Sequence, residues 1–273
     1  MITNAHRIAH FRKGDSKLLF EEERKSQLVQ YLERNQRASV QELSENFEVS
    51  ESTIRRDLKE LEEAKLLKRT HGGAVALQSA GFEPSILDKE DVLRPEKERI
   101  AREAARRIRE GDTILLDSGT TTLHLAREIK QFNSIRVITN SMLVLNELKD
   151  SRNIEVTLLG GILRPETQAF VGPMTEQSLE MIRVDKAFIA TNGIDLKQGI
   201  TTPNLVEAAT KRKMIQIAGE VILLTDHSKI GKVAYAKFAD IPDIHHCIID
   251  QGVRTDFVNE LKKLEVDVTL ASE

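Results

Sequence analysis

Residues 49–61 (VSESTIRRDLKEL) constrain the fold of this chain more than any other part of its sequence. Ile54, Leu58 and Leu61 are spaced i, i+4 and i+7, which places them on one stripe of a helix. The side chains left on the opposite surface carry hydroxyl, guanidinium and ammonium groups. These groups bind phosphates and base edges in a DNA major groove. The stretch therefore predicts a helix that buries one face and offers the other to DNA.

The sequence before this helix predicts two more helices. The first runs from about residue 21 to residue 35. Ser39 and Glu42 fit a capping box that opens a short second helix. A turn follows, and the hydroxyl of Ser50 can cap the third helix. Helix, short helix, turn and polar-faced helix is the helix-turn-helix arrangement.

Two short strand-like segments follow the third helix. Residues 66–76 (LLKRTHGGAVA) read as a hairpin around two glycines. Such a hairpin would be a wing that carries Lys68, Arg69 or His71 to the sugar-phosphate backbone. An amphipathic helix with outward arginines can also be an ordinary solvated helix, but the capped spacing and the basic hairpin together favour DNA binding. Asp57 is expected to pair with or orient an arginine. The predicted DNA contacts are Ser50, Ser52, Thr53, Arg55, Arg56, Lys59, Arg69 and His71.

This part of the chain resembles the DeoR family of bacterial transcriptional regulators. The resemblance runs from residue 24 to residue 74 and rests on the motifs STIRRDL at 52–58 and HGGA at 71–74. It implies a winged helix-turn-helix in front of a sugar-phosphate sensing domain. Lys65 stands where the family usually has a glycine, and a lysine in the last helical turn is compatible with the helix dipole. Residues 1–16 lack an apolar run, and we expect a flexible arm or an over-called start site.

Composition excludes some classes of protein. The chain of 273 residues has room for one small and one medium domain. Its single cysteine, Cys247, gives neither a disulfide framework nor a zinc site, which favours the cytoplasm. No apolar run is long enough for a membrane span, so no membrane partner is expected. The net charge of −3 does not indicate nucleic-acid binding, so attraction to DNA must come from a local patch.

Beyond the wing, the pattern changes to an α/β domain. Ser79, Gly81, Pro84 and Pro95 interrupt the periodicity, which predicts a linker over residues 77–95. Apolar strands then alternate with amphipathic helices, which is typical of a parallel sheet covered on both faces. The expected strands are 113–117, 135–139, 154–159, 186–190, 221–225, 246–250 and 266–270. The predicted domains are thus an arm over 1–16, a winged helix-turn-helix over 17–76, the linker, and an α/β domain over 96–273.

Ligands of such sheets bind where strands end and helices begin. Residues 117–122 (DSGTTT) run from a strand into a helix, and a glycine, hydroxyls and a helix N-terminus together suit a phosphate. The loop is neither a Walker loop nor a dinucleotide fingerprint. An ordinary capped helix start is the alternative. Polar or glycine-rich residues also follow the strands at 139–141, 160–161, 191–193 and 226–229, and their convergence at one edge favours a polyhydroxylated phosphate ester.

Residues 96–251 also resemble the DeoR sensor domain, whose fold is similar to ribose-phosphate and glucosamine-phosphate isomerases. The resemblance implies a phosphate at residues 118–122, a sugar ring near Asn140 and Gly160–Gly161, and Lys229 as a second cationic contact. Glu207 either faces the pocket or is a solvated helix carboxylate. The predicted effector site is Asp117, Ser118, Gly119, Thr120, Thr121, Thr122, Asn140, Gly160, Gly161, Glu207 and Lys229.

The sequence therefore predicts an oligomeric DNA-binding regulator, a dimer or tetramer. It is expected to repress a carbohydrate catabolism operon and to leave its operator when a phosphorylated sugar binds. No metal or cofactor is expected. The alternative is a sugar-phosphate isomerase with a regulatory head, for which Glu207, Asp226 and His227 are the candidate acids or bases. None of them lies in an isomerase motif, and an enzyme has no need of a winged helix.

Overall fold

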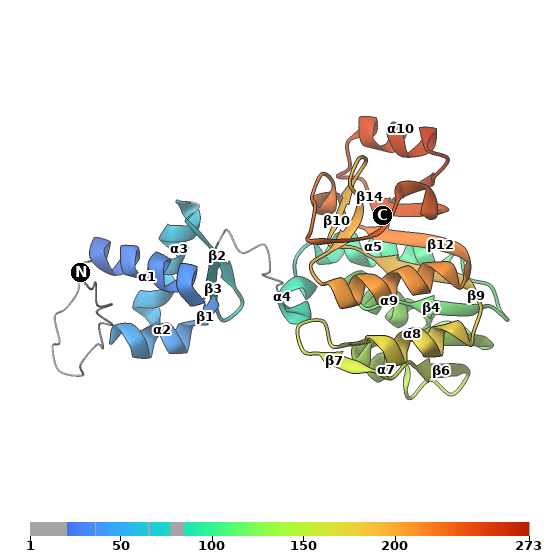
Figure 1. The fold of residues 1–273 in the computed structure, drawn as a ribbon, viewed down its shortest axis with the longest axis horizontal. Coiled ribbons are helices and arrows are strands. Elements are labelled where there is room, and N and C mark those ends of the chain that lie inside the picture. The colour runs from blue at the N-terminus through green and yellow to red at the C-terminus, as the bar shows by residue number, and fades with distance from the viewer. Residues whose placement is uncertain (1–20, 36, 65, 77–84, 273) are drawn as a thin grey trace, which may run out of the picture. The chain divides into compact units, whose positions relative to one another are not determined.

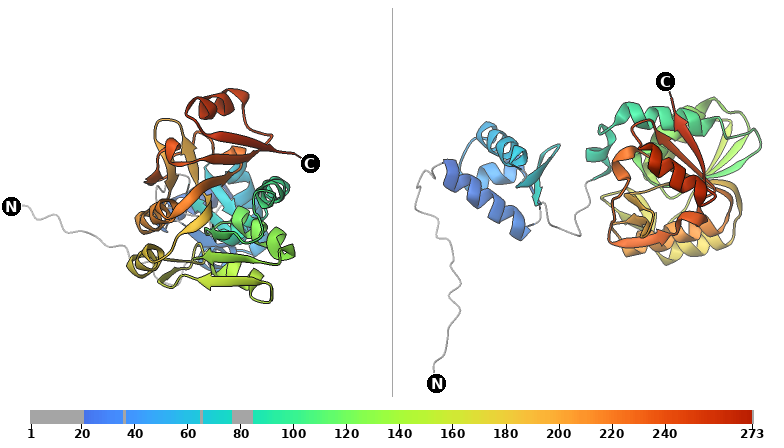
Figure 2. Two further views of the ribbon diagram at one scale, coloured as in Figure 1. Left: turned by 90° about the vertical axis from the view of Figure 1, so that its right-hand side faces the viewer. Right: turned by 90° about the horizontal axis from the view of Figure 1, so that it is seen from above.

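A computed structural model describes residues 21–35, 37–64, 66–76 and 85–272 of the chain. The chain divides between Ser79 and Ala80 into two compact units, each of which Figures 1 and 2 show as a ribbon. The expected arm over residues 1–16 and the departure at Lys65 lie outside the described residues, as does the first part of the expected linker.

The first unit contains three helices and a small antiparallel sheet. The helices are α1 (Glu21–Asn35), α2 (Val40–Phe47) and α3 (Glu51–Glu63). The strands β1 (Arg37–Ser39), β2 (Leu67–Thr70) and β3 (Gly73–Ala76) pair in the order β1-β3-β2. The core holds the apolar stripe of α3 with residues from all three helices and β2: Leu28, Leu32, Leu43, Ile54, Leu58, Leu61 and Leu67. The predicted winged helix-turn-helix is confirmed.

Both predicted helix caps are present. The Ser39 hydroxyl accepts a hydrogen bond from the backbone N–H of Glu42, and the Glu42 carboxylate accepts one from the N–H of Ser39. Glu48 ends α2 in the left-handed conformation with φ of 52°. The Ser50 hydroxyl then accepts from the N–H of Thr53 and so starts α3. These caps fix the turn between the two helices.

Strand β1 was not predicted, and it explains one of the paired glycines. A Cβ atom on Gly73 would lie 2.0 Å from the carbonyl oxygen of Ala38, which belongs to β1. Gly73 therefore permits the close approach of β1 to β3, whereas Gly72 has open space where a Cβ would lie.

The second unit is built on a seven-stranded sheet in the order β15-β14-β12-β9-β4-β5-β6. All neighbouring strands in it are parallel. Its members correspond to the seven strands predicted from the sequence, with ends shifted by up to three residues. They are β4 (Thr113–Leu116), β5 (Ile135–Thr139), β6 (Ile154–Leu158), β9 (Val184–Ala190), β12 (Ala218–Thr225), β14 (His246–Asp250) and β15 (Asp267–Ala271).

Helices cover both faces of this sheet (Figure 1). Alternate residues of the strands point to opposite faces, so Ile114 and Leu115 belong to different apolar clusters. One cluster contains residues of α5 (Arg94–Ala105), α6 (Thr120–Glu128) and α7 (Met142–Leu148). The other contains residues of α8 (Pro173–Glu180), α9 (Leu205–Gln216) and α10 (Thr255–Lys263). The predicted α/β architecture is confirmed.

Several short elements near the ends of the strands were not predicted. A hairpin joins β7 (Ile162–Arg164) and β8 (Ala169–Val171). A second small sheet contains β10 (Gly193–Asp195), β11 (Gly199–Thr202) and β13 (Ala236–Ala239). The short helices η1 (Ile129–Gln131), η2 (His227–Lys229) and η3 (Ile241–Asp243) complete the unit.

The later part of the expected linker over residues 77–95 is helical. Helix α4 (Ile86–Glu90) lies within it, and α5 begins at Arg94. The sequence predicts an interruption at Pro95, but this residue occupies the first turn of α5, where a helix does not need the missing N–H.

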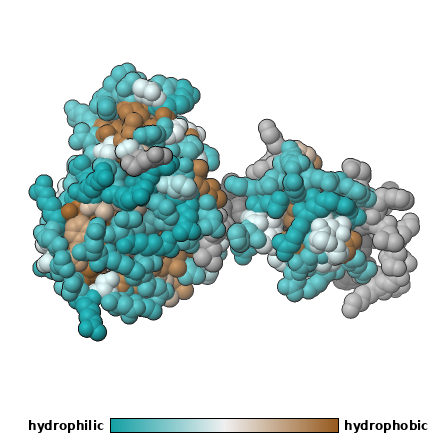
Figure 3. Space-filling view, turned by 180° about the vertical axis from the view of Figure 1, so that it is seen from behind, coloured by the Kyte–Doolittle hydropathy of each residue, from teal (hydrophilic) through white to brown (hydrophobic). Residues whose placement is uncertain are grey.

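The face of the molecule in Figure 3 is mainly hydrophilic, with separate hydrophobic areas. Among the described residues, no helix combines the length and apolar character that a membrane span requires.

Candidate DNA interface and effector site

The outer face of α3 carries the predicted DNA contacts. Arg55 and Arg56 are exposed, and each makes a peripheral ion pair: Arg55 with Glu51 at 3.0 Å and Arg56 with Glu21 at 4.0 Å. Lys59 lies 3.9 Å from Glu63. Exposed pairs of this kind contribute little to stability, so a DNA phosphate can replace the carboxylate at low cost. Ser52 is exposed as well, and Thr53 is partly buried.

Ser50 is already used within the protein. Its hydroxyl caps α3 and lies 2.8 Å from the Ser52 hydroxyl and 2.9 Å from the Thr53 hydroxyl. A contact between Ser50 and DNA would compete with these interactions. Its main role is to position the first turn of α3.

Asp57 is fully buried under this face. The Arg24 guanidinium donates two hydrogen bonds to its carboxylate, one from Nε at 2.6 Å and one from Nη2 at 3.2 Å. This confirms that Asp57 pairs with an arginine. A two-point pair of this kind fixes orientation as well as distance, so it locks α3 against α1.

The wing offers basic side chains on β2 and in the turn after it. Lys68, Arg69 and His71 are exposed. The backbone N–H of Arg69 donates to the Glu62 carboxylate of α3 at 2.8 Å. This bond ties the wing to the helix that carries the other predicted contacts.

In the second unit, a buried ion network lies at the carboxyl ends of β4 and β9. Asp117, directly after β4, accepts hydrogen bonds on Oδ2 from Lys211 Nζ and from the N–H of Ala190, the latter at 3.0 Å. Lys211 also lies 3.6 Å from Glu207, one turn earlier on α9. Arg164 of β7 pairs with the other oxygen of Glu207. Two carboxylates and two cations therefore alternate across the network, and Glu207 is a buried member of it instead of a solvated helix carboxylate.

Polar atoms without partners surround this network. Within the described residues, Asp117 Oδ1, Ser118 Oγ, Asn140 Oδ1 and Thr167 Oγ1 are buried and have no hydrogen-bond partner. Asn140 follows β5, and its amide Nδ2 donates to the Phe170 carbonyl at 2.9 Å. Burying a polar atom without a partner is costly, so a group of them at one sheet edge indicates a site that a polar ligand completes.

The loop at residues 117–122 has the features of an anion site, with one change from the sequence prediction. Gly119 precedes α6 without any side-chain cap, which leaves the first-turn N–H groups available to an anion. Ser118, Thr120 and Thr121 are buried beside them. Thr122 serves the loop itself, because its hydroxyl lies 2.7 Å from the Asp117 carbonyl and 3.0 Å from that of Gly119.

Gly160 and Gly161 connect β6 to the hairpin. Gly160 accepts a hydrogen bond on its carbonyl from the Thr175 hydroxyl at 2.7 Å. Gly161 has φ of 153°, and a Cβ there would lie 2.2 Å from the Thr175 hydroxyl. The geometry thus gives the pair a role in fitting this turn against α8. It does not by itself supply a sugar contact.

Lysines approach the same sheet edge from two elements. Lys229 of η2 lies 3.8 Å from Asp226 and 3.3 Å from the Ser228 hydroxyl. Lys97 of α5 is almost completely buried, and burial lowers its pKa to about 8. The charges of Asp226 and Lys229 also act on Lys97.

Sequence reasoning missed four residues of this region: Lys97, Arg164, Thr167 and Lys211. Lys211 had one available signal, since it follows Glu207 at i+4 on a helix and such pairs interact. Arg164 and Thr167 lie in a hairpin that was not predicted. Lys97 lies next to the expected linker and has no motif around it.

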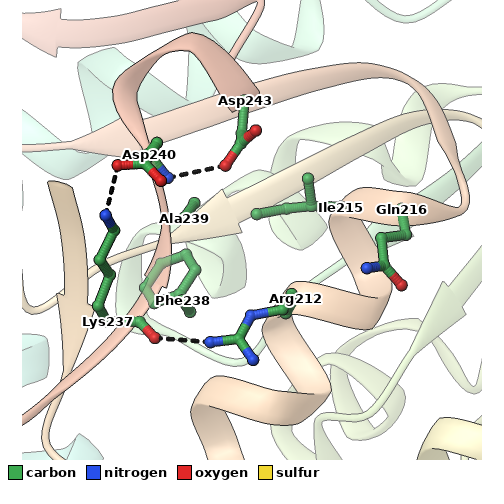
Figure 4. A pocket seen from close by; sticks show the side chains of 8 residues that line it. All are labelled: Arg212, Ile215, Gln216, Lys237, Phe238, Ala239, Asp240 and Asp243. Carbon is green, nitrogen blue, oxygen red and sulfur yellow. Dashed lines mark hydrogen bonds and ion pairs between the residues drawn. The ribbon is translucent and has the colours of Figure 1, made fainter.

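A separate cavity of about 290 Å³ lies at the C-terminal end of α9 (Figure 4). Arg212 donates there to the Lys237 carbonyl at 3.0 Å, and Lys237 pairs with Asp240. Because Lys237 is already neutralised by Asp240 and Arg212 already donates to a carbonyl, the cavity suits a phosphate less well than the sheet edge does. The described residues also contain no group of three or more His, Cys, Asp or Glu side chains placed to hold a metal ion.

Two family models match this chain. Residues 24–80 match the DeoR-like helix-turn-helix domain, and residues 94–251 match the DeoR C terminal sensor domain. Among solved structures, ribose 5-phosphate isomerase A from Methanocaldococcus jannaschii is 18% identical with a TM-score of 0.36. That match covers 49% of this chain and 53% of the isomerase, and it is too weak to indicate an activity.

Curated relatives match along nearly the whole chain. The HTH-type transcriptional regulator GlpR of Haloferax volcanii is 38% identical over 90% of this chain and 96% of its own length. The transcriptional repressor AccR of Agrobacterium fabrum is 34% identical, over 92% and 98% respectively. The lactose phosphotransferase system repressor of Staphylococcus epidermidis is 39% identical, over 85% and 90%. These relatives are named as regulators of transcription and not as enzymes, so the isomerase alternative is set aside. The chain belongs to the DeoR family of DNA-binding transcriptional regulators.

Proposed function

We propose that this regulator represses a carbohydrate catabolism operon and leaves its operator when a phosphorylated sugar binds to the second unit. The protein acts in the cytoplasm as a homo-oligomer. Two copies of α3 enter major grooves one helical turn apart, as in other dimeric helix-turn-helix proteins. Thr53, Arg55 and Arg56 make the groove and nearby phosphate contacts.

The observation that carries the effector proposal is the buried Ser118 hydroxyl. Within the described part of the chain this oxygen has no hydrogen-bond partner, and it directly precedes the uncapped N-terminus of α6. A phosphate oxygen at this position would accept from the hydroxyl and from the N–H groups of the first helical turn. Lys229 supplies positive charge on the same side of the sheet.

The remaining unpartnered atoms favour a sugar as the rest of the ligand. Asp117 Oδ1 and Asn140 Oδ1 are hydrogen-bond acceptors, and sugar hydroxyls are donors. The ion network beside them presents further polar groups from Arg164 and Glu207. Similarity to the lactose phosphotransferase system repressor supports a carbohydrate context for this chain.

Thermal unfolding of the full chain tests this proposal. A panel of sugar phosphates is compared with the same sugars without phosphate. One ester should raise the melting temperature of the second unit, because a ligand that binds only the folded state stabilises it. The unphosphorylated sugar should give no shift at the same concentration.

Ser118→Ala provides the matched variant, since it removes the hydroxyl and adds no bulk to this buried position. The shift caused by the ester should shrink strongly in this variant. Equal shifts with and without phosphate, or an undiminished shift in Ser118→Ala, would contradict the proposed site.

A further inference from the structure

Lys97 is a buried ammonium group whose acceptor is a neutral carbonyl. Its side chain lies in the first turns of α5 and is 3% exposed. Its Nζ donates a hydrogen bond to the backbone carbonyl of Lys89, the fourth residue of α4. Among the described residues it forms no ion pair with a carboxylate. A buried cation without an anion is energetically unfavourable, and an arriving anion would relieve this.

Lys97 lies on a helix that packs against α6, the helix whose first turn forms part of the candidate phosphate site. Helix α5 precedes β4, so its first turns lie at the carboxyl edge of the parallel sheet. Lys97 responds there to the charges of Asp226 and Lys229, which follow β12 at the same edge. Lys97 and His124 also act on each other electrostatically, and His124 lies one turn into α6.

Polar contacts among the described residues hold helix α4 to the second unit, and three of them are made by elements of the candidate site or beside it. The N–H of Ile86 donates to the Glu166 carbonyl at 2.8 Å, in the hairpin that carries Arg164 and Thr167. Glu90 accepts from Arg127 of α6 at 2.8 Å. The third contact is the Lys97 bond to Lys89. Since α4 has only five residues, it depends on such contacts for its stability.

We propose that Lys97 is a phosphate-binding residue of the effector site and that it leaves the Lys89 carbonyl when the anion binds, which loosens α4. This inference rests on the proposed function and adds how binding is transmitted. In the sequence, α4 is the first described element after β3 and the DNA-binding unit.

The physical basis is a competition between two acceptors for one ammonium group. A hydrogen bond from Lys97 to a phosphate dianion is stronger than one to a neutral carbonyl, above all in a buried position. Withdrawal of the cation also removes a favourable charge from the C-terminal end of α4. The effector therefore favours the state in which α4 is loose. If DNA binds more tightly to the state in which α4 is held, then the effector weakens DNA binding and DNA weakens effector binding to the same extent.

Hydrogen exchange and phosphate binding test this inference on the full chain. The probe is inorganic phosphate, and exchange is followed in peptides that cover residues 85–93. Phosphate should accelerate exchange there in the native sequence. Lys97→Met should weaken phosphate binding by about tenfold or more and should give fast exchange without phosphate. Lys97→Arg should retain binding, because it keeps the charge.

Two further variants separate the possible outcomes. Lys229→Met should also weaken phosphate binding but should leave residues 85–93 protected without phosphate. Lys186 lies near the start of β9 and pairs with Asp112 at 2.6 Å. Lys186→Met should change neither phosphate binding nor hydrogen exchange over residues 85–93.

Each contrary result has a distinct meaning. If the native chain does not bind phosphate, the proposed function and this inference fall together. If Lys229→Met loses binding while Lys97→Met keeps it, this inference alone is wrong. Phosphate binding that leaves exchange over residues 85–93 unchanged would likewise overturn it.

Discussion

Asp57 lies on the helix that carries the predicted DNA contacts, yet its carboxylate is buried and held by Arg24. Its neighbours Arg55 and Arg56 are exposed, and the ion pairs that they make with other described residues are exposed as well. Charged side chains one position apart on this helix therefore serve different purposes. The buried pair sets the orientation of α3, and the exposed pairs remain exchangeable.

Substitution of Asp57 should mainly affect stability. Asp57→Asn leaves the Arg24 guanidinium buried without its counter-charge, and breaking a buried pair costs roughly 3–5 kcal/mol. Differential scanning calorimetry of the full chain should show the transition of the first unit at a lower temperature. Glu51→Gln is the control, because it removes only the exposed partner of Arg55 and should change stability by less than about 0.5 kcal/mol. Similar effects of both variants would contradict the role of Asp57.

Substitution of the exposed arginines should affect DNA and not folding. Arg55→Ala and Arg56→Ala should each weaken operator binding by about 1–3 kcal/mol where the side chain reads a base. Where the side chain contacts a phosphate, the slope of the logarithm of the DNA-binding constant against the logarithm of the salt concentration should become shallower by about one unit. The melting temperature should stay unchanged. Arg254→Ala, an exposed arginine of the second unit, should leave DNA affinity intact; full affinity in the α3 variants would remove these residues from the interface.

The lowered pKa of Lys97 gives a test by pH. Burial holds this pKa at about 8, so near pH 8 about half of the free protein carries no proton on Lys97. A bound anion favours the charged form and raises the pKa, so binding at pH 8 should take up protons. Sulfate is a suitable probe because it does not titrate in this range. Calorimetry in two buffers of different ionisation enthalpy should show uptake in the native chain and a strongly reduced uptake in Lys97→Met. Equal uptake in both would exclude Lys97 as its source.

At the scale of elements, the regular parts of the fold were predictable and the short ones were not. The inner strands of the parallel sheet contain continuous apolar runs, such as residues 114–116, 187–190 and 221–224, and the capped helices of the first unit carry both cap residues and an apolar stripe. Strands β1, β7 and β8 have three residues each, too few for a periodic pattern. Strand β1 forms because β3, more than thirty residues later in the chain, supplies its hydrogen bonds, whereas β7 and β8 pair with each other in a hairpin.

In the candidate effector site, too, the residues at the ends of regular strands were predictable and those that depend on tertiary packing were not. Asp117, Ser118 and Asn140 directly follow apolar strands, so the rule for parallel sheets places them at one edge. Arg164 and Lys211 reach this edge from a hairpin and from the side of a helix, and their approach depends on tertiary packing. Helix α9 offered little help, because buried polar residues such as Glu207 and Thr210 lie on it beside buried apolar ones.

The two adjacent glycines of the wing provide a prediction at this scale. Gly73→Ala should displace β1 from β3, since the new Cβ would lie 2.0 Å from the Ala38 carbonyl oxygen. Both the stability of the first unit and its DNA affinity should fall. Gly72→Ala should be tolerated, because a Cβ there meets no atom within 4 Å. Thermal unfolding and DNA binding measure both effects, and equal behaviour of the two variants would show that β1 does not need the close approach.

At the scale of the whole molecule, the two units have separate cores and separate candidate sites. A signal between them must therefore pass as a change in the equilibrium between two states of the chain. Helix α4 is suited to take part, because its contacts reach the hairpin, α5 and α6 around the candidate site. The central claim is that a phosphate ester bound at that site controls DNA binding by the other unit.

Fluorescence anisotropy tests this claim most directly, with labelled DNA from just upstream of the gene's own operon and a panel of sugar phosphates. We expect tight, salt-sensitive binding that one ester releases and its parent sugar does not. The double variant Thr120→Ala, Lys229→Ala should bind the same DNA and should no longer respond to the ester. DNA binding that no ester alters, or a double variant that responds like the native chain, would contradict the account.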